Sequence, residues 1–210
     1  MELKVKDFNP AAATWDEKPR RVQLAADVAK AIRGYVPVPP RAEAMEFGCG
    51  TGLLTFNLID MLAQVVAVDR AEGMLTIVKK KAATLGATQV TTKLIADDLS
   101  ALGTEEYDFI YSNMVLHHLP AIEPVLERLV AALKPGGVLA LSDLEDDDGT
   151  FHDKPEGVVQ SGIKSSWLMK ALERLGLINQ GHTVAHSIVK QRAGEGKAYP
   201  IFLVWGARAQ

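Results

Sequence analysis

Apolar residues recur along this chain of 210 residues in short blocks, separated by longer stretches with helical spacing. The short blocks are bounded by Gly, Pro or Asp, which is typical of buried strands, and they lie at 42–47, 65–69, 91–97, 107–113 and 138–143. Most of the intervening stretches have apolar residues three and four positions apart, which predicts helices. This alternation predicts a parallel sheet with right-handed crossovers and helices on both faces.

The N-terminal part follows a different pattern. After a polar start it contains one stretch of helical periodicity, in which Pro19 suits the first turn and Gly34 the C-terminal cap. A Pro-rich stretch then interrupts regular structure. We therefore expect residues 1–40 to form an N-terminal helical cap and residues 41–210 to form the main domain.

The C-terminal part also departs from the alternation, because a predicted helix at 165–176 is followed by two strands with no helix between them. These strands, at 182–190 and 199–208, are joined by a short polar loop, so their simplest pairing is antiparallel. The expected fold class is α/β, with a doubly wound sheet of seven strands that is mostly parallel and ends in an antiparallel pair.

Composition and charge narrow the class of protein. Hydrophobic residues make up 48% and charged residues 23% of the chain, as in an ordinary globular domain. The net charge of −3 gives no sign of non-specific binding to nucleic acid or to an anionic membrane. Cys49 is the only cysteine, which excludes an internal disulfide. With no secretion signal and no apolar stretch near the ~20 residues of a membrane span, we expect a cytoplasmic protein.

The stretch AMEFGCGTG at 44–52 carries the first candidate chemistry, because Gly48, Gly50 and Gly52 follow the first predicted strand with Glu46 just upstream. Ligands of open parallel sheets bind beyond the carboxyl ends of strands. The dinucleotide fingerprint has the spacing G-x-G-x-x-G, whereas this chain has G-x-G-x-G. A carboxylate would also repel a pyrophosphate, by a few kcal/mol in a partly buried site. Glu46 therefore argues against a dinucleotide and for a cationic ligand.

Further acidic residues follow the next two strands. Asp69 ends the second predicted strand, where a carboxylate can accept hydrogen bonds from both hydroxyls of a ribose. Asp97, Asp98 and Leu99 follow the third, where a side-chain acceptor and a backbone N–H can bind an adenine edge. Ribose, adenine and a cation together describe S-adenosylmethionine.

Five motifs occur in an order that resembles the class I S-adenosylmethionine-dependent methyltransferases: EFGCGTG, VVAVDRAEGML, IADDL, YDFIYSNMVLHHL and LKPGGVLALSD. The resemblance covers residues 41–143, and the antiparallel C-terminal pair matches the usual ending of this family. It implies a Rossmann-like fold. It also implies that the backbone at the glycines passes close to the methionine part of the cofactor and that Glu46 acts near the cofactor's ammonium through water or polar groups of the loop.

The resemblance assigns the remaining contacts residue by residue. It implies that Asp69 holds the ribose with Arg70 beside it, and that Met74 packs on the adenine. It implies that Asp97 accepts from the adenine amino group, that Asp98 or Leu99 donates from the backbone, and that the methionine end is lined by Asn113. Trp15 suggests that the N-terminal segment folds over the cofactor and shields it from water; the alternative is a capped helix, because Thr14 and Glu17 have capping-box spacing.

Candidate residues for catalysis are fewer. Adjacent His117 and His118 point in divergent directions, so packing explains them better than joint metal binding. His152 follows the fifth predicted strand, where substrates enter, and is the general-base candidate. The acidic run 143–153 does not match a calcium loop and fits a solvated loop, so no metal is expected.

The sequence thus predicts an enzyme that methylates a small-molecule acceptor, most similar to the quinone-biosynthesis and general small-molecule group, although the N-terminal signature of quinone enzymes is not evident. One alternative is a protein or nucleic-acid methyltransferase, against which stand the acidic balance and SNMV in place of an Asn-Pro-Pro-Tyr motif. Others are a non-catalytic cofactor-binding protein and a nicotinamide-dependent oxidoreductase, the latter disfavoured by Glu46. We expect no nucleic-acid or membrane partner and a monomer or homodimer.

Overall fold

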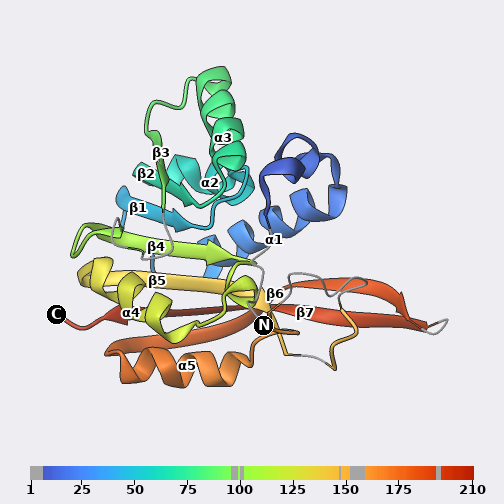
Figure 1. The fold of residues 1–210 in the computed structure, drawn as a ribbon. Coiled ribbons are helices and arrows are strands. Elements are labelled where there is room, and N and C mark those ends of the chain that lie inside the picture. Colours follow the sequence, from blue (N-terminus) through green and yellow to red (C-terminus); the bar gives the residue numbers. More distant parts are fainter. Residues whose placement is uncertain (1–6, 96–98, 100–101, 147, 152–158, 193–194) are drawn as a thin grey trace.

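The fold is built on one sheet of seven strands in the order β3-β2-β1-β4-β5-β7-β6 (Figure 1). This computed structural model describes residues 7–95, 99, 102–146, 148–151, 159–192 and 195–210. The strands are β1 Ala42–Phe47, β2 Leu62–Asp69, β3 Val90–Leu94, β4 Tyr107–Asn113, β5 Leu133–Leu144, β6 Leu177–Arg192 and β7 Glu195–Arg208. Pairing is parallel from β3 through β5 and antiparallel at β5–β7 and β7–β6, which confirms the predicted α/β fold.

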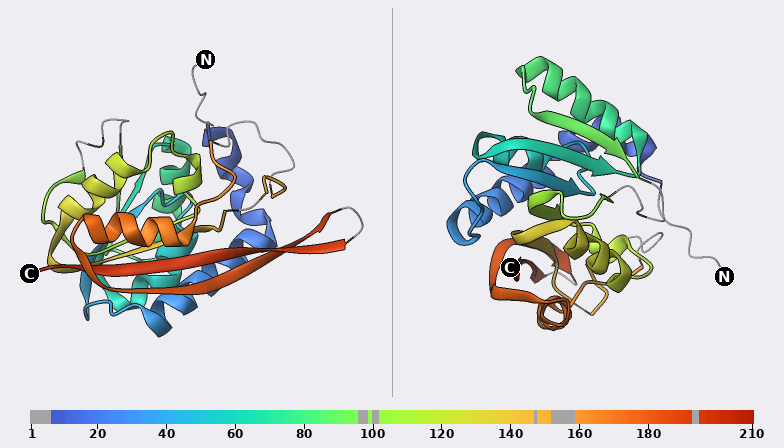
Figure 2. Two further views of the ribbon diagram at one scale, coloured as in Figure 1. Left: turned by 90° about the horizontal axis from the view of Figure 1, so that it is seen from below. Right: turned by 90° about the vertical axis from the view of Figure 1, so that its left-hand side faces the viewer.

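Helices cover both faces of the sheet. They are α1 Pro19–Tyr35, α2 Leu53–Leu58, α3 Glu72–Leu85, α4 Glu123–Ala132 and α5 Ser165–Arg174, with 3-10 turns η1 Asn9–Glu17, η2 Ile59–Met61 and η4 Leu116–His118. The buried clusters place α1, α2 and α3 on one face and α4 and α5 on the other (Figures 1 and 2). None of the described helices has the length and apolar character needed to cross a membrane.

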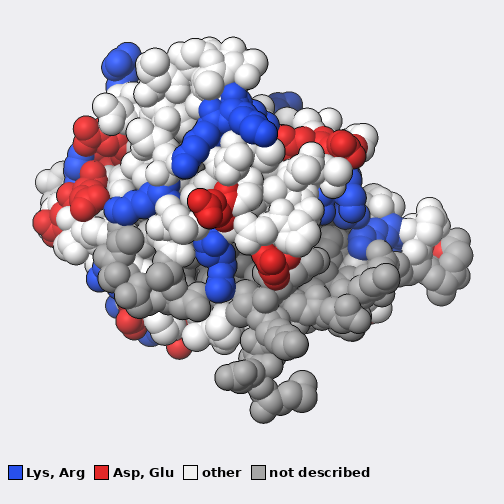
Figure 3. All heavy atoms as spheres, turned by 45° about the horizontal axis from the view of Figure 1, so that its top comes forward, with Lys and Arg blue, Asp and Glu red and all other residues white. Residues whose placement is uncertain are grey.

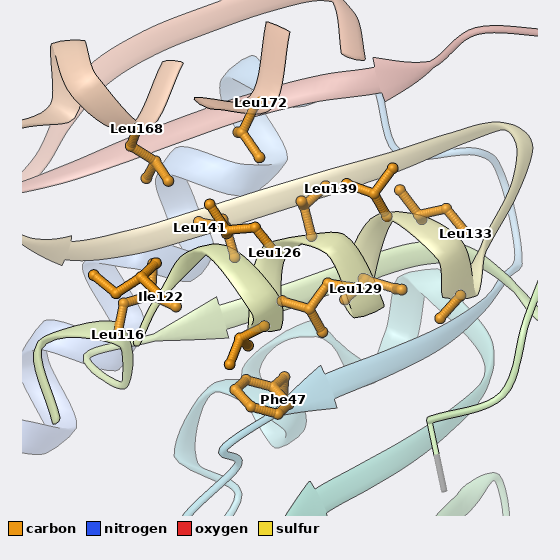
Figure 4. Close-up of a cluster of buried hydrophobic side chains, with 14 of the residues drawn as sticks. Phe47, Leu116, Ile122, Leu126, Leu129, Leu133, Leu139, Leu141, Leu168 and Leu172 are labelled. Carbon is orange, nitrogen blue, oxygen red and sulfur yellow. The ribbon is translucent and has the colours of Figure 1, made fainter. Parts of the chain in front are cut away.

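The larger core lies between the sheet and the α4–α5 layer. Figure 4 shows Leu126 of α4 and Leu168 and Leu172 of α5 pointing toward the strands, where Phe47 and Leu139 meet them. Leu126, Leu139, Leu168 and Leu172 each have 0% of their surface exposed. Their burial supplies the hydrophobic free energy that holds the sheet rigid behind the ends of β1 and β4.

The element boundaries differ from the sequence-based expectation at several points. The helix expected at 53–62 ends at Leu58, because the chain tightens into η2 and β2 begins already at Leu62. Gly34 does not cap α1: the helix runs through it to Tyr35, and the N–H of Val36 donates to the Ile32 carbonyl at 3.0 Å. Pro19 does occupy the first turn, as predicted.

The C-terminal hairpin is longer than the sequence predicts. β7 pairs with β5 only over Ile201–Ala207, which faces Val138–Leu144. Beyond Ile201, β7 continues to pair with β6 back to Glu195, so the hairpin projects past the carboxyl end of β5 (Figure 2). This projecting part places residues of β6 beside the N-terminal half of α1, with which β6 makes its own contacts.

The α4 layer gives the first test of this packing. Leu126→Ala should lower the free energy of unfolding by about 2–5 kcal/mol, because the removed atoms leave a cavity in a fully buried cluster. Equilibrium unfolding in urea measures the change. Val189→Ala, at a side chain that is 65% exposed, is the control and should stay within about 0.5 kcal/mol of the unchanged protein. Similar losses in both variants would contradict the described core.

Candidate active site

The glycine loop between β1 and α2 closes over the carboxyl end of β2. Gly48, Gly50 and Gly52 have φ values of +69°, +53° and +78°, a left-handed backbone that glycine adopts without steric cost. At Gly48 a Cβ atom would lie 2.4 Å from Cγ2 of Val115, so no side chain fits there. The Cys49 N–H donates to the Val68 carbonyl at 2.9 Å, which ties the loop to β2.

Asp69 occupies the centre of this connection at the end of β2. One carboxylate oxygen accepts from the Gly50 N–H and the other from the Ala71 N–H, each at 2.8 Å. Burial raises the pKa of Asp69, and these backbone donors oppose the rise. Because each oxygen has a second lone pair, the carboxylate retains acceptor capacity toward the cavity that it lines.

Glu46 lies deeper, with only 2% of its surface exposed. The Thr55 hydroxyl donates to its carboxylate, and burial raises the pKa of Glu46 to about 8. The Tyr111 hydroxyl is buried nearby, and burial raises its pKa. A carboxyl group in this setting keeps its proton near neutral pH and ionises readily only when a positive charge approaches.

The other predicted cofactor contacts divide into three groups. Arg70, Met74 and Asn113 line the same cavity as Glu46 and Asp69. The side-chain oxygen of Asn113 accepts from the Ser142 hydroxyl at 2.6 Å, which fixes its amide group. The side chain of Leu99 packs against the main core, and its predicted backbone contact with adenine is not tested by this packing. Asp97 and Asp98 lie outside the described residues.

The N-terminal segment is fastened to the glycine loop and to α3. Asp16 accepts from the Thr51 hydroxyl at 2.6 Å and pairs with the Lys81 ammonium at 2.6 Å. Asn9 accepts from the Gly73 N–H at 2.8 Å, so the segment is held at two places. The capping box that the sequence suggests around Trp15 does not form, because the 3-10 turn η1 runs through to Glu17 and α1 begins without a side-chain cap.

Trp15 lines the cavity from this segment and packs with the buried Met74. The Arg21 guanidinium lies 3.4 Å from the centre of its ring and donates to the Trp15 carbonyl at 3.1 Å. Burial lowers the pKa of Arg21, and the like charge of Arg20 adds to this effect. An aromatic wall and a desolvated cation therefore stand side by side at the cavity.

A buried pair of His117 and Asp143 is the feature that the sequence analysis missed. Nδ1 of His117 lies 2.5 Å from Oδ1 of Asp143, which also accepts from the Leu144 N–H at 2.7 Å. His117 and His118 both line the cavity, with ring centres 4.0 Å apart. The two residues of the pair are 26 positions apart, and only the adjacency of η4 and the end of β5 brings them together. His152 lies outside the described residues.

The acidic run after β5 is dispersed among different partners. Asp143 faces inward to His117, while Glu145 accepts from the Ser165 N–H at 3.0 Å. Asp148 pairs with Lys197 at 2.5 Å on the projecting hairpin. Among the residues that the structure describes, no group of three or more His, Cys, Asp or Glu side chains is arranged to hold a metal ion.

One cavity of about 630 Å³ collects these features at the carboxyl ends of the parallel strands, in the size range of small-molecule sites. It lies where strand order reverses between β1 and β4, as the switch-point rule predicts. The predicted residues that line it are Trp15, Glu46, Gly48, Gly50, Asp69, Arg70, Met74 and Asn113. Gly52 instead forms the N-terminal cap of α2.

Comparison with known proteins agrees with this geometry. The family model described as methyltransferase domain matches residues 45–139. A malonyl-(acyl-carrier protein) O-methyltransferase from Anoxybacillus flavithermus is 34% identical over 154 residues, which are 72% of this chain and 56% of that protein. A ubiquinone biosynthesis O-methyltransferase from Xanthomonas axonopodis pv. citri is 28% identical over 113 residues, 54% of this chain and 47% of that protein.

Solved structures show the same fold. The structure of a SAM-dependent methyltransferase from Aquifex aeolicus superposes with a TM-score of 0.71 at 21% identity, covering 96% of this chain and 99% of that one. Fold and site together define a doubly wound α/β protein with its ligand cavity at the switch point. The methyltransferase-domain match and these relatives support assignment of the chain to the class I S-adenosylmethionine-dependent methyltransferases.

The elevated pKa of Glu46 predicts a pH-dependent stability. The folded protein holds a proton at Glu46 that the unfolded chain releases near its ordinary value of 4.5, so this contribution is present below that pH and is lost as the pH rises through about 8. Urea unfolding at pH 5.5 and pH 8.5 should show a loss of a few kcal/mol in the unchanged protein and a smaller loss in Glu46→Gln.

A residual pH dependence is expected in Glu46→Gln because the pKa of Asp69 is raised in the same direction. Glu127→Gln, at an exposed position of α4, is the matched control and should lose as much stability as the unchanged protein. If Glu46→Gln and Glu127→Gln behave alike, the buried carboxyl group is not the source of the pH dependence.

Proposed function

We propose that this chain transfers a methyl group from S-adenosylmethionine to a small-molecule acceptor. The observation that carries the proposal is the meeting of Asp69, Glu46 and Asn113 in one cavity beside the glycine loop, at the carboxyl ends of three adjacent strands. The chain spans about half the length of the curated relatives it matches, between 38% and 56% for four of them. The activities and substrates of those proteins therefore support the proposal only as properties of related proteins.

The donor set in this cavity fits S-adenosylmethionine. We assign the ribose hydroxyls to the free lone pairs of Asp69, with Arg70 beside them, and the adenine to the wall formed by Met74 and Trp15. Glu46 and Asn113 face the methionine end together with the backbone at Gly48 and Gly50. The adenine contacts from Asp97, Asp98 and Leu99 stay predictions of the family resemblance.

The chemistry makes modest demands on the protein. S-adenosylmethionine supplies an electrophilic methyl group, which an acceptor atom attacks in line while the sulfur leaves as a neutral thioether. The protein contributes by aligning the acceptor with the methyl group and excluding water, a large part of the acceleration such a reaction needs. A base is required only for an acceptor that must lose a proton.

His152 remains the predicted general base for such an acceptor. His117 is the described alternative, because it lines the cavity and its Nδ1 is held by the buried Asp143. A carboxylate partner fixes the orientation of an imidazole ring, which a positioned base requires. We place His117 near the acceptor and not near the adenine, because it follows β4 and is held by Asp143 at the end of β5.

The alternatives are distinguished by ligand preference. A nicotinamide-dependent oxidoreductase would bind NAD, whereas a cofactor-binding protein without catalysis would bind S-adenosylmethionine and transfer nothing. A carrier-protein acceptor is a further option, since one relative is named for malonyl-(acyl-carrier protein). The cytoplasmic location, the absence of nucleic-acid partners and a monomeric or homodimeric state stay predictions from the sequence.

Calorimetric titration with S-adenosylmethionine, S-adenosylhomocysteine and NAD tests the proposal first. Binding of both sulfur compounds without NAD is the expected result, and Asp69→Asn should weaken it about 10–100-fold, because charge-assisted hydrogen bonds to the ribose are lost. Asp60→Asn, an exposed carboxylate paired with Arg33 outside the cavity, is the control and should bind normally. NAD binding, or no binding at all, would overturn the assignment.

We further propose that residues 1–40 act as a cap that slows cofactor release. Asp16→Ala removes the hydrogen bond to Thr51 and the ion pair with Lys81, so S-adenosylhomocysteine should dissociate several-fold faster in stopped-flow measurements. Glu17→Gln, an exposed neighbour in the same segment, should leave the rate unchanged. Equal rates in all three proteins would show that the segment does not retain the ligand.

A further inference from the structure

Positive charge is concentrated in the cavity although the chain as a whole carries a net charge of −3. The basic residues that line it are Lys18, Arg20, Arg21, Arg70 and Lys190. The carboxylates among its described lining are Glu46 and Asp69, and both lie at the cofactor end. Figure 3 shows basic and acidic side chains interspersed over the described surface of one face.

The basic residues are not all at the cofactor end. Arg70 directly follows β2, whereas Lys190 belongs to β6, and β1, β4, β5 and β7 separate these two strands in the sheet. The cavity therefore extends across the sheet, from the nucleoside site toward the projecting hairpin.

Contacts between α1 and β6 locate Lys190 more closely. Nδ1 of His186 lies 2.8 Å from Asp27 of α1, and Ile188 shares a buried cluster with Leu24, one helical turn earlier. Alternate residues of a strand share a face, so the next residue on this face is Lys190, and the next turn of α1 toward its N-terminus contains Arg21. Lys190 and the first turn of α1 thus border the same end of the cavity.

Aromatic rings hold two of these cations in place. The Lys190 ammonium lies 4.2 Å from the centre of the Phe151 ring and donates to the Phe151 carbonyl. The Arg21 guanidinium stacks on Trp15 at 3.4 Å. Phe151 also packs with Leu24 and Ile188, so an apolar wall lies directly beside the cationic groups.

The charges of Arg20 and Arg21 lie close together at the start of α1, and the charge of Asp16 opposes the effect of Arg20 on Arg21. The first turn of α1 contains no acidic residue, and Arg20 and Arg21 add like charge at the positive end of the helix. Burial and the neighbouring charge of Arg20 already lower the pKa of Arg21. The methionine carboxylate of S-adenosylmethionine would lie at the cofactor end, whereas Lys190 lines the cavity across the sheet from it.

We propose that the methyl acceptor is a small-molecule oxyanion, with a carboxylate or phosphate group held by Lys190 and Arg21 and an apolar body against Phe151, Leu24 and Ile188. This inference rests on the proposed methyl transfer. The oxyanion anchors the acceptor at the hairpin end, and the acceptor's nucleophilic atom lies near Asn113 in the middle of the cavity. That atom gains the methyl group and, if it is a hydroxyl oxygen, gives its proton to a base.

Transfer of a radioactive methyl group from S-adenosylmethionine tests the acceptor class. The acceptors are a panel of hydroxy- and amino-substituted aryl and alkyl carboxylic acids, the primary amides of the same compounds and the corresponding phosphate monoesters, so that each carries a nucleophilic atom separate from its anionic or amide group. The acids or the phosphate esters should be methylated at least tenfold more efficiently than the matched amides, and comparison of these two arms identifies the anionic group. If the amides are methylated as efficiently as both kinds of anion, the proposal is wrong.

Substitution at the hairpin links the preference to its residue. Lys190→Gln should raise KM for the preferred anion about tenfold or more and leave the dissociation constant of S-adenosylhomocysteine unchanged. Lys197→Gln, on the adjacent strand and paired with Asp148 outside the cavity, should alter neither value. An unchanged KM in Lys190→Gln would remove Lys190 from acceptor binding, and transfer restricted to neutral acceptors would reject the oxyanion.

The same measurements separate this inference from the proposed function. Failure to bind S-adenosylhomocysteine, or binding without transfer to any member of the panel, would count against methylation of a small molecule and thereby against the inference that depends on it. Tight binding with transfer to amides alone would leave the methyltransferase assignment intact and reject only the oxyanion.

Discussion

The carboxylate of Asp69 is the contact on which the rest of the site depends. It joins the glycine loop to the first turn of α3 through two backbone N–H groups, Gly50 and Ala71. The loop is thereby fixed at the carboxyl end of β2, and the N-terminal segment is fixed in turn by Thr51 and Gly73. Because backbone donors already use one lone pair of each oxygen, the position of the carboxylate is set before any ligand arrives.

Burial gives the second acidic residue a different role. Glu46 is almost fully enclosed with the hydroxyls of Thr55 and Tyr111, and a pKa of about 8 means that it carries little charge near neutral pH. A fixed negative charge would repel the neighbouring Asp69 and would destabilise the loop. A group that ionises in response to a cationic ligand avoids this cost and still contributes its attraction when it is needed.

The sequence predicts the cofactor end of the fold well because its determinants are local. The glycines, Glu46 and Asp69 lie at the ends of strands whose apolar runs are short and bounded, so their position follows from strand parity and topology. The His117–Asp143 pair depends on contact between segments 26 residues apart, and no local pattern marks it. Asp143 even appears in the sequence as the start of a solvated acidic run, while in the structure it is fully buried.

Tertiary packing also overrides the local signals for helix ends and hairpin length. The capping-box spacing at Thr14 and Glu17 is not used, because the segment is held instead by Asp16 on the glycine loop and Asn9 on α3. The hairpin extends beyond the strands expected from its apolar residues because β6 and β7 pair with each other where β5 has already ended. Cross-strand pairing stabilises this part, and the contact with α1 fixes its direction.

The position of the N-terminal segment and the length of the β6–β7 hairpin both bear on specificity for the methyl acceptor. The cofactor end is formed by β1, β2 and β4, whose buried strands tolerate little change in a packed core. The far end is formed by the start of α1, the projecting part of β6 and Phe151, whose buried side chains form a smaller cluster of their own. Changes at this end affect the smaller cluster more than the larger core between the sheet and the α4–α5 layer. A fixed nucleoside site joined to an adaptable acceptor wall would let one fold serve many acceptors, and in the proposed assignment that wall carries Lys190 and Arg21 beside apolar side chains.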